Sequence, residues 1–207
     1  METQSTAAGN SVVLEIPGVF GKRTVTFTDD AMSCGKQTIA YKDAERVWYQ
    51  AVNQSINLVP TSQSYSFAVT SAAQRIALNF GTTLHIGNKK RKDVWGRLIA
   101  ISQRVIEPHI VQKCLNAIFV RGETLRIGEI ELDRSGFTKI KMFGGRVTIP
   151  WNEVAYIPSY SRGSVICWTK KNDKAKALGT VAMLTPNSVV LPNLFQACIN
   201  SARNPGH

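Results

Sequence analysis

A short motif occurs twice in the chain, and this repeat constrains the fold more than any other feature. Thr38–Ala44 reads Thr-Ile-Ala-Tyr-Lys-Asp-Ala, and Thr148–Val154 reads Thr-Ile-Pro-Trp-Asn-Glu-Val, 110 positions later. Upstream of each copy, Val25–Asp29 matches Glu129–Asp133 at an offset of 104. Similarity at a fixed spacing is typical of duplicated structural units. We therefore expect two small β-rich units in tandem.

Alternating apolar residues and turn residues predict an antiparallel meander in each unit. A polar stretch with Pro60 predicts a loop at 57–64 in the first unit. The expected strands of the first unit are 12–16, 23–29, 37–41, 47–52, 65–69 and 76–80. Those of the second are 124–133, 137–143, 146–151, 155–157, 163–168 and 178–183.

Helical spacing predicts an amphipathic helix after each meander. Asp93 is a favourable N-cap residue, and the first helix is kinked at Pro108, so the predicted helical segment is 93–120. The second helix follows Pro186-Asn187 near the C-terminus. Apolar residues recur on one face of each helix: Val94, Leu98, Ile101 and Val105 in the first, and Leu194, Phe195, Cys198 and Ile199 in the second.

These elements predict an α+β protein with a defined domain organisation. Residues 1–10 are small and polar and are expected to be a disordered tail. The first unit spans 11–120 and includes the kinked helical segment 93–120, and the second spans 121–203. Each unit is expected to be a curled antiparallel meander or barrel capped by an amphipathic helix, because a helix over one end of a bent sheet covers its apolar mouth.

Several short motifs of the second unit carry a family resemblance: Gly122-Glu123, Ile127-Gly128, Leu132-Asp133, Ile149–Val154, Pro186-Asn187 and Leu194–Ile199. The first unit keeps Tyr41 and Asp43 but has Ala40 where the second has Pro150. With these residues the chain resembles a group of bacterial proteins of unknown function that have pleckstrin-homology-like (PH-like) domains, and the likeness extends over about residues 24–203. The resemblance implies two tandem PH-like units and a non-catalytic scaffold, and it implies no particular ligand.

Positive charge is spread over both units. The chain has 25 Lys and Arg against 14 Asp and Glu, a formal net charge of +11. Divided at Gly122, the two parts carry an excess of +6 and +5. A basic balance of this size favours an anionic partner, such as a membrane surface, an acidic protein face or a nucleic acid. The alternative is that the charge serves solubility alone.

Three basic clusters are the candidate anion or lipid sites, with solvated loops as the alternative reading. Basic residues near the first hairpin of PH-like barrels often bind phosphoinositide headgroups, so the resemblance favours the cluster beside Gly144-Gly145. The equivalent hairpin of the first unit has only Lys36, which places such a site in the second unit. The clusters are Lys139, Lys141 and Arg146; Lys170, Lys171 and Lys174 with Lys176; and Lys89, Lys90, Arg91 and Lys92.

Catalytic and metal-binding patterns are not found, so we expect a binding protein without catalytic residues, metal or cofactor. The three histidines have no ligand spacing between them. Glu129, Glu131 and Asp133 would share one face of a strand, where they could hold a hard cation or simply be solvated. The four cysteines form no CxxC motif and are expected to be free thiols in a reducing compartment.

The aromatic residues and the N-terminus complete the functional expectations. Trp48 and Tyr49 are adjacent on a predicted strand and would point to opposite faces, so at least one is a candidate partner contact. Residues 1–9 lack a secretory pattern, and no apolar run reaches the ~20 residues of a membrane span. We expect a cytoplasmic adaptor protein at the inner membrane face. The alternatives are recognition of protein alone and binding of nucleic acid through the basic patches.

Overall fold

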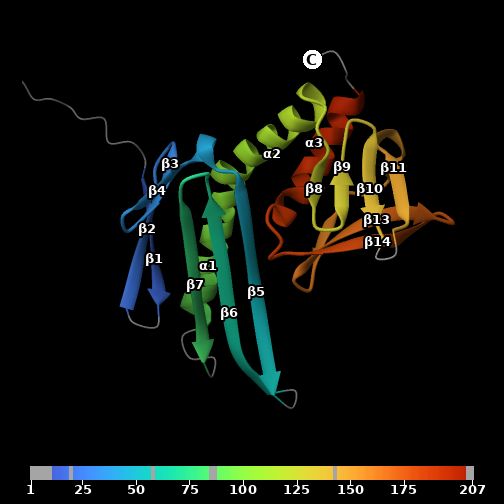
Figure 1. Cartoon of the computed structure of the whole chain (residues 1–207). Helices are drawn as coiled ribbons and strands as arrows, with labels where there is room; N and C mark the ends of the chain where they lie inside the picture. Colours follow the sequence, from blue (N-terminus) through green and yellow to red (C-terminus); the bar gives the residue numbers. More distant parts are fainter. Residues whose placement is uncertain (1–10, 19–20, 57–58, 84–87, 142–143, 204–207) are drawn as a thin grey trace, which may run out of the picture.

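The strands form four antiparallel sheets, and the sheets follow one another in the same order in both halves of the chain (Figure 1). The computed structural model describes residues 11–18, 21–56, 59–83, 88–141 and 144–203. The predicted α+β class is confirmed. No closed barrel joins the sheets over these residues. The predicted tail at 1–10 lies outside the described residues.

The first unit comprises a four-stranded sheet, a three-stranded sheet and a helix. The four-stranded sheet contains β1 (Val12–Gly18), β2 (Gly21–Phe27), β3 (Ala31–Cys34) and β4 (Gln37–Ala40). The other sheet contains β5 (Arg46–Ile56), β6 (Val59–Thr70) and β7 (Arg75–Thr83), and α1 (Asn88–Ile101) follows it. The predicted loop at 57–64 is therefore wrong from residue 59 onward, because the β5–β6 backbone ladder continues through polar residues.

The second unit repeats this order with shorter strands. Its four-stranded sheet contains β8 (Leu125–Ile127), β9 (Ile130–Leu132), β10 (Gly136–Ile140) and β11 (Arg146–Pro150). Its three-stranded sheet contains β12 (Ser159–Ser161), β13 (Ser164–Lys171) and β14 (Lys174–Ala182), and α3 (Leu191–Arg203) follows. The strand predicted at 124–133 is wrong, because Gly128 has a φ of 62° and turns the chain into the β8–β9 hairpin.

The repeated motif forms the same corner in both units. β4 and β11 each end in a single 3-10 turn, Tyr41–Asp43 and Trp151–Glu153, whose aromatic residue is 2% exposed. The Tyr41 hydroxyl donates to the carbonyl of Thr28 at 2.8 Å, and the Trp151 indole N–H donates to the carbonyl of Asp133 at 2.9 Å. The aromatic ring of each corner thereby ties the fourth strand to the end of the second.

This corner also corrects the alignment of the upstream repeat. Thr28 and Asp133 occupy equivalent positions, since the backbone N–H of Thr28 donates to Ala31 and that of Asp133 donates to Gly136. The offset there is 105 rather than the predicted 104. Phe27 and Leu132, buried at 2% and 0% exposure, then coincide, whereas the offset of 104 would set apolar positions against polar ones.

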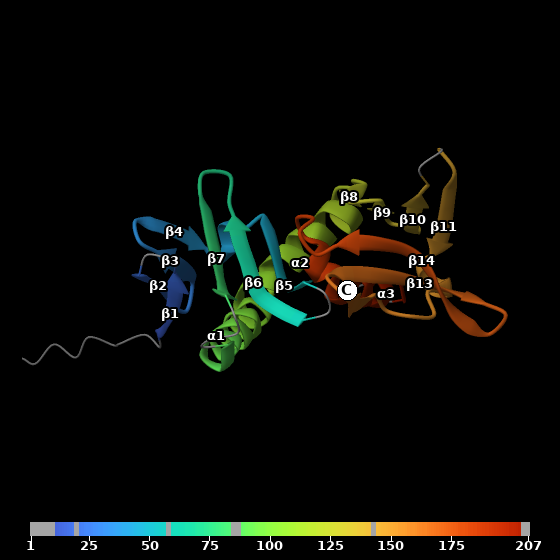
Figure 2. The same ribbon diagram turned by 90° about the horizontal axis from the view of Figure 1, so that it is seen from below.

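A helical segment longer than predicted runs from the first unit to the second (Figures 1 and 2). It begins at Asn88 rather than Asp93, so Lys89–Lys92 lie in the first turns of α1 and not in a loop. A five-residue π-turn (Ser102–Ile106) separates α1 from α2 (Glu107–Leu115), and a second π-turn (Asn116–Val120) ends the segment. Pro108 lies in the first turn of α2, where the missing N–H is tolerated. Residues 102–120 are called the linking helix below.

Each unit has an aromatic core beneath its own helix. In the first unit, Trp95 of α1 lies 5.1 Å from Tyr65 and 6.1 Å from Phe80 between ring centroids. In the second, Phe195 of α3 lies 4.8 Å from Phe137 and 5.4 Å from Trp151. Offset and edge-to-face ring contacts at these separations add stability beyond the burial of apolar area.

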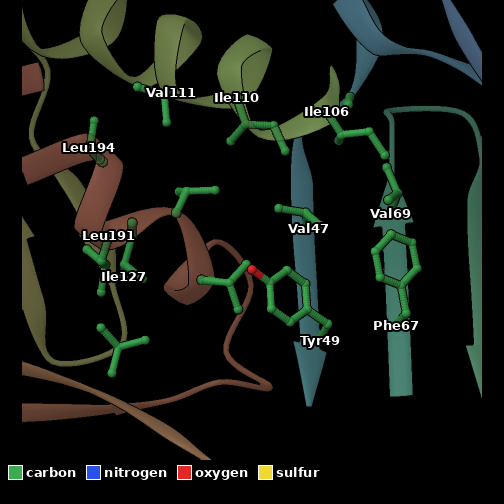
Figure 3. Close-up of a cluster of buried hydrophobic side chains, with 14 of the residues drawn as sticks. Val47, Tyr49, Phe67, Val69, Ile106, Ile110, Val111, Ile127, Leu191 and Leu194 are labelled. Atoms are coloured by element: carbon green, nitrogen blue, oxygen red, sulfur yellow. The ribbon is translucent and has the colours of Figure 1, made fainter. Parts of the chain in front are cut away.

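The linking helix joins the two cores into one cluster (Figure 3). Val47 from β5, Ile110 from α2 and Leu191 from α3 are 0–1% exposed and lie at this junction. Packed apolar side chains rather than a flexible connection therefore hold the two units against each other.

Asn187 fastens the second unit to the edge of β5. Its backbone N–H donates to the carbonyl of Val47 at 2.9 Å, and its Oδ1 accepts from the N–H of Val47 at 2.9 Å. Its Nδ2 donates to the carbonyl of Glu45 at 2.9 Å. Asn187 adopts a left-handed conformation with φ of 64°, which asparagine tolerates better than most residues. One residue thus satisfies three polar groups of an otherwise open strand edge.

Candidate anion-binding site

A hollow of about 560 Å³ lies beside β2 in the first unit. β2 pairs with β1 along its whole length, but the β2–β3 ladder begins only at Val25. On that side of β2, Lys22, Arg23 and Thr24 pair with no other strand of the described residues. The β3–β4 turn bounds the hollow with Cys34, Gly35, Lys36 and Gln37, and Ile76 and Ala77 of β7 complete its lining. We call this the β2 hollow.

The charged residues in the described lining of the β2 hollow are all basic. Lys22, Arg23 and Lys36 are exposed, and the described lining includes no acidic residue. Lys22 donates to Glu15 at 2.6 Å, which holds the pKa of that exposed carboxyl below its usual value. Because neighbours on a strand point to opposite faces, the side chains of Lys22 and Arg23 leave β2 on opposite sides. Arg23 and Lys36 therefore supply the positive charge of the hollow, and Lys22 faces Glu15.

A smaller hollow of about 180 Å³ adjoins the β2 hollow through Lys22. Glu15 and Pro17 of β1 line it, together with Lys90 and Arg91 of α1. The predicted run Lys89–Lys92 therefore contributes two of its members to the neighbourhood of β2. Cations in the first turn of a helix meet an unfavourable helix dipole, and the first turn of α1 contains no acidic residue to offset this.

The cluster that the resemblance favours is largely paired with carboxylates. Lys139 forms an ion pair with Glu129, and Arg146 forms one with Glu131. The Lys139 side chain is only 13% exposed. Lys141 follows β10 and remains exposed. Two of the three cations thus already have an anionic partner within the chain.

The three nearby acidic residues do not share a strand face. Glu129 lies in the β8–β9 turn and Glu131 in β9, and each pairs with one of the basic residues above. Asp133 follows β9, where its carboxylate accepts from the backbone N–H groups of Ser135 and Gly136. The arrangement is a set of separate local contacts, and no group of three potential metal ligands was found in the described part of the chain.

The third predicted cluster lies at the tip of the β13–β14 hairpin. Lys171 and Lys174 face each other at the end of the ladder, and Asn172 and Asp173 form the turn with φ of 49° and 60°. Lys170 pairs with Asp173 at 2.9 Å, while Lys171, Lys174 and Lys176 are exposed. This tip is a convex, positively charged projection rather than a hollow.

Trp48 and Tyr49 point to opposite faces of β5, as predicted. Trp48 is half-buried, and the guanidinium of Arg75 lies 5.3 Å from its ring centroid. Tyr49 is 4% exposed and its hydroxyl bonds to Glu107 inside the molecule. Of the two candidate partner contacts, only Trp48 reaches the surface.

The cysteines are free, as predicted. Burial raises the pKa of the Cys114 thiol to about 11 and that of Cys167 and Cys198 to about 12. Cys34 is half-buried and lines the β2 hollow. Protonated thiols at these three positions, of which Cys167 and Cys198 are fully buried and Cys114 is half-buried, are consistent with a packing role.

Sequence reasoning missed the β2 hollow because its cations are far apart in the chain. Lys22 and Arg23 lie at the start of β2, and Lys36 lies in the β3–β4 turn. The three residues therefore form no continuous basic run in the sequence. The signal that could have revealed the hollow is that β3 is shorter than β2 and leaves the start of β2 uncovered. The predicted strands did not show this difference in length. Comparisons with protein-family models, with curated proteins and with solved structures found no match.

Proposed function

We propose that the protein is a non-enzymatic adaptor with two tandem PH-like units that binds phosphorylated headgroups of an anionic membrane in its β2 hollow. The repeated order of four strands, three strands and one helix supports the PH-like assignment. The net charge of +11 supports an anionic partner. The protein would act in the cytoplasm, at the inner membrane face.

The observation that carries this proposal is the presence of Arg23 and Lys36 at one concave surface whose described lining includes no acidic residue. A hollow of about 560 Å³ falls within the range of small-ligand sites, which suits a headgroup better than a flat protein face. Lysine and arginine donate to phosphate oxygens with charge-assisted hydrogen bonds. In the described part of the chain no helix is both long and apolar enough to cross a membrane.

The β2 hollow is a stronger candidate than the hairpin at Lys139, Lys141 and Arg146. An anion at that hairpin would have to compete with Glu129 and Glu131 for Lys139 and Arg146. Among the described residues of the β2 hollow, Lys22 alone is paired with a carboxylate, and that pair is exposed, so it contributes little stability. The β13–β14 tip and Lys89–Lys92 would add long-range attraction toward the membrane.

Sedimentation with vesicles tests the proposal. Wild-type protein should be retained by vesicles that contain phosphatidylserine or a phosphoinositide and not by phosphatidylcholine alone. Each basic residue near an anionic membrane contributes about 1 kcal/mol, so Arg23→Gln with Lys36→Gln should weaken retention roughly thirty-fold. Lys171→Gln with Lys174→Gln removes the same charge from the β13–β14 tip and should have a much smaller effect.

Other outcomes would overturn specific parts of the proposal. An equal loss of vesicle retention in both double variants would reject the hollow as the binding site and would indicate non-specific electrostatic attraction alone. Loss on replacing Lys139, Lys141 and Arg146, with none at Arg23 and Lys36, would place the site in the second unit. No retention of wild-type protein at low salt would reject the membrane function and favour an acidic protein or a nucleic acid.

A further inference from the structure

A buried polar cluster lies where the two units meet the linking helix. Glu107, the first residue of α2, is 0% exposed. The Tyr49 hydroxyl donates to its Oε1 at 3.1 Å, and the Ser102 hydroxyl donates to the same oxygen at 3.5 Å. Gln103 Nε2 donates to the Tyr49 hydroxyl at 3.3 Å. Ser102 and Gln103 belong to the π-turn, a helix irregularity that often occurs at functional positions.

The surroundings of Glu107 favour a neutral carboxyl group. Its second oxygen, Oε2, is buried without a hydrogen-bond partner. A buried carboxylate needs a cation or several donors to offset the loss of hydration. The donors here are two hydroxyl groups on one oxygen, and no cation among the described residues stabilises the charge. Ionisation would therefore leave a poorly solvated negative charge in the core.

The cluster connects elements from both units. Tyr49 extends from β5 of the first unit toward the second (Figure 3). Tyr160 of β12 interacts with Tyr49 and donates to the carbonyl of Val189 at 2.6 Å. Val189 precedes α3, beside Ser188, whose buried hydroxyl also lacks a partner. A charge on Glu107 would therefore act on β5, on the linking helix and on the segment that leads into α3, because all three are connected to the cluster.

We propose that Glu107 is a proton-sensitive latch between the two units. In its neutral form the junction of β5, the linking helix and β12 is closed. In its ionised form the junction is weakened, and its segments open more often. The inference is independent of what the β2 hollow binds.

The titration range of the group supports this role. Burial raises the pKa of Glu107 to about 7, against the opposing effect of the hydrogen bonds from Tyr49 and Ser102. The titratable groups that face it are Tyr49 from β5 and Tyr160 from β12, and burial raises the pKa of both phenols, so they stay neutral. Because the pKa of this acid is raised in the folded state, the junction is most stable below about pH 4.5, loses stability as the pH rises from about 4.5 to about 7, and loses little more above that.

Amide hydrogen exchange, corrected for the intrinsic effect of pH, measures this opening directly. Peptides from β5, from 102–111 and from 186–191 should open about ten times more readily at pH 8 than at pH 6, as expected for one group with a pKa near 7. Glu107→Gln has the same shape and no charge, and its exchange at the junction should not depend on pH. Glu153→Gln replaces an exposed glutamate and should behave like the wild type.

Two results would overturn the latch. Exchange in wild-type protein that does not change between pH 6 and pH 8 would do so, and so would a pH response that survives Glu107→Gln. Tyr49→Phe is a second test if the glutamine variant does not fold. Removing that donor should move the midpoint of the response to higher pH, whereas a merely structural role would raise exchange equally at every pH.

Discussion

At the scale of single residues, two aromatic side chains explain why the repeat is visible in the sequence. Tyr41 and Trp151 fill equivalent corners, and each donates to a carbonyl at the end of the second strand of its unit. A buried ring with one polar atom needs such an acceptor. The repeat could be read from the sequence because a corner of this kind requires an aromatic residue between a strand and a turn.

Replacing Trp151 by Phe should separate the hydrogen bond from the packing. The variant keeps most of the ring but leaves the Asp133 carbonyl without its donor, so the free energy of unfolding should fall by about 1–3 kcal/mol. Trp168→Phe is the matched control, since its indole bonds to Ser159 in an exposed setting. Urea denaturation measures the free energy of unfolding of both variants. Equal decreases in the two variants would contradict a special role for the Trp151 corner.

The titration of Glu107 should also appear in the overall stability. With a pKa of 4.5 in the unfolded chain and about 7 in the folded one, ionisation lowers the free energy of unfolding by about 3 kcal/mol between pH 4 and pH 8. Glu107→Gln should remove this part of the pH dependence. Denaturation curves of both proteins at several pH values would show parallel profiles if Glu107 were ionised throughout.

At the scale of elements, apolar alternation predicted most strands but misplaced their boundaries. It missed β3 and β12, and the strand predicted at 155–157 is wrong, because no strand forms there. The β5–β6 hairpin extends into polar residues because its backbone ladder needs no apolar face to continue. α1 starts at Asn88, where four consecutive cations argued for a loop. Asn187 was singled out only as part of a closing motif. Its contact with β5 could not be predicted, since it depends on how the two units meet.

Two substitutions at Asn187 should measure that contact. Asn187→Gly keeps access to the left-handed backbone but loses the side-chain bonds to Val47 and Glu45, for a loss of about 1–3 kcal/mol. Asn187→Ala loses the same bonds and adds the backbone strain of about 1 kcal/mol, so it should be the less stable variant. Thermal unfolding ranks the stabilities of the two variants. An alanine variant as stable as the wild type would show that the Asn187 contact with β5 contributes nothing to stability.

At the scale of the whole molecule, charge and topology point to different sites. Sequence reasoning placed basic clusters at local runs and at the second-unit hairpin that the resemblance favoured. Folding pairs Lys139 and Arg146 of that hairpin with carboxylates and gathers Lys22, Arg23 and Lys36 around the β2 hollow. Such redistribution depends on strand lengths and pairing, which a single sequence does not specify well.

Salt should distinguish contact at the hollow from general attraction. Exposed charges are screened over about 8 Å at physiological ionic strength, so long-range attraction from the β13–β14 tip should disappear as salt rises. The salt dependence of binding grows with the number of cations that contact anionic groups. Vesicle retention of the wild type should therefore fall more steeply between 0.1 and 0.5 M NaCl than that of Arg23→Gln with Lys36→Gln, and identical slopes would contradict contact at these two residues.

The most direct measurement is a titration of isotope-labelled protein with a soluble, short-chain phosphoinositide, followed by amide chemical shifts. Binding in the β2 hollow predicts the largest changes at Lys22–Thr24 and at Gly35–Gln37, with smaller ones at Ile76 and Ala77. Changes confined to the neighbourhood of Lys139, Lys141 and Arg146, or no changes at millimolar ligand, would contradict the proposal that the first unit holds the anion site.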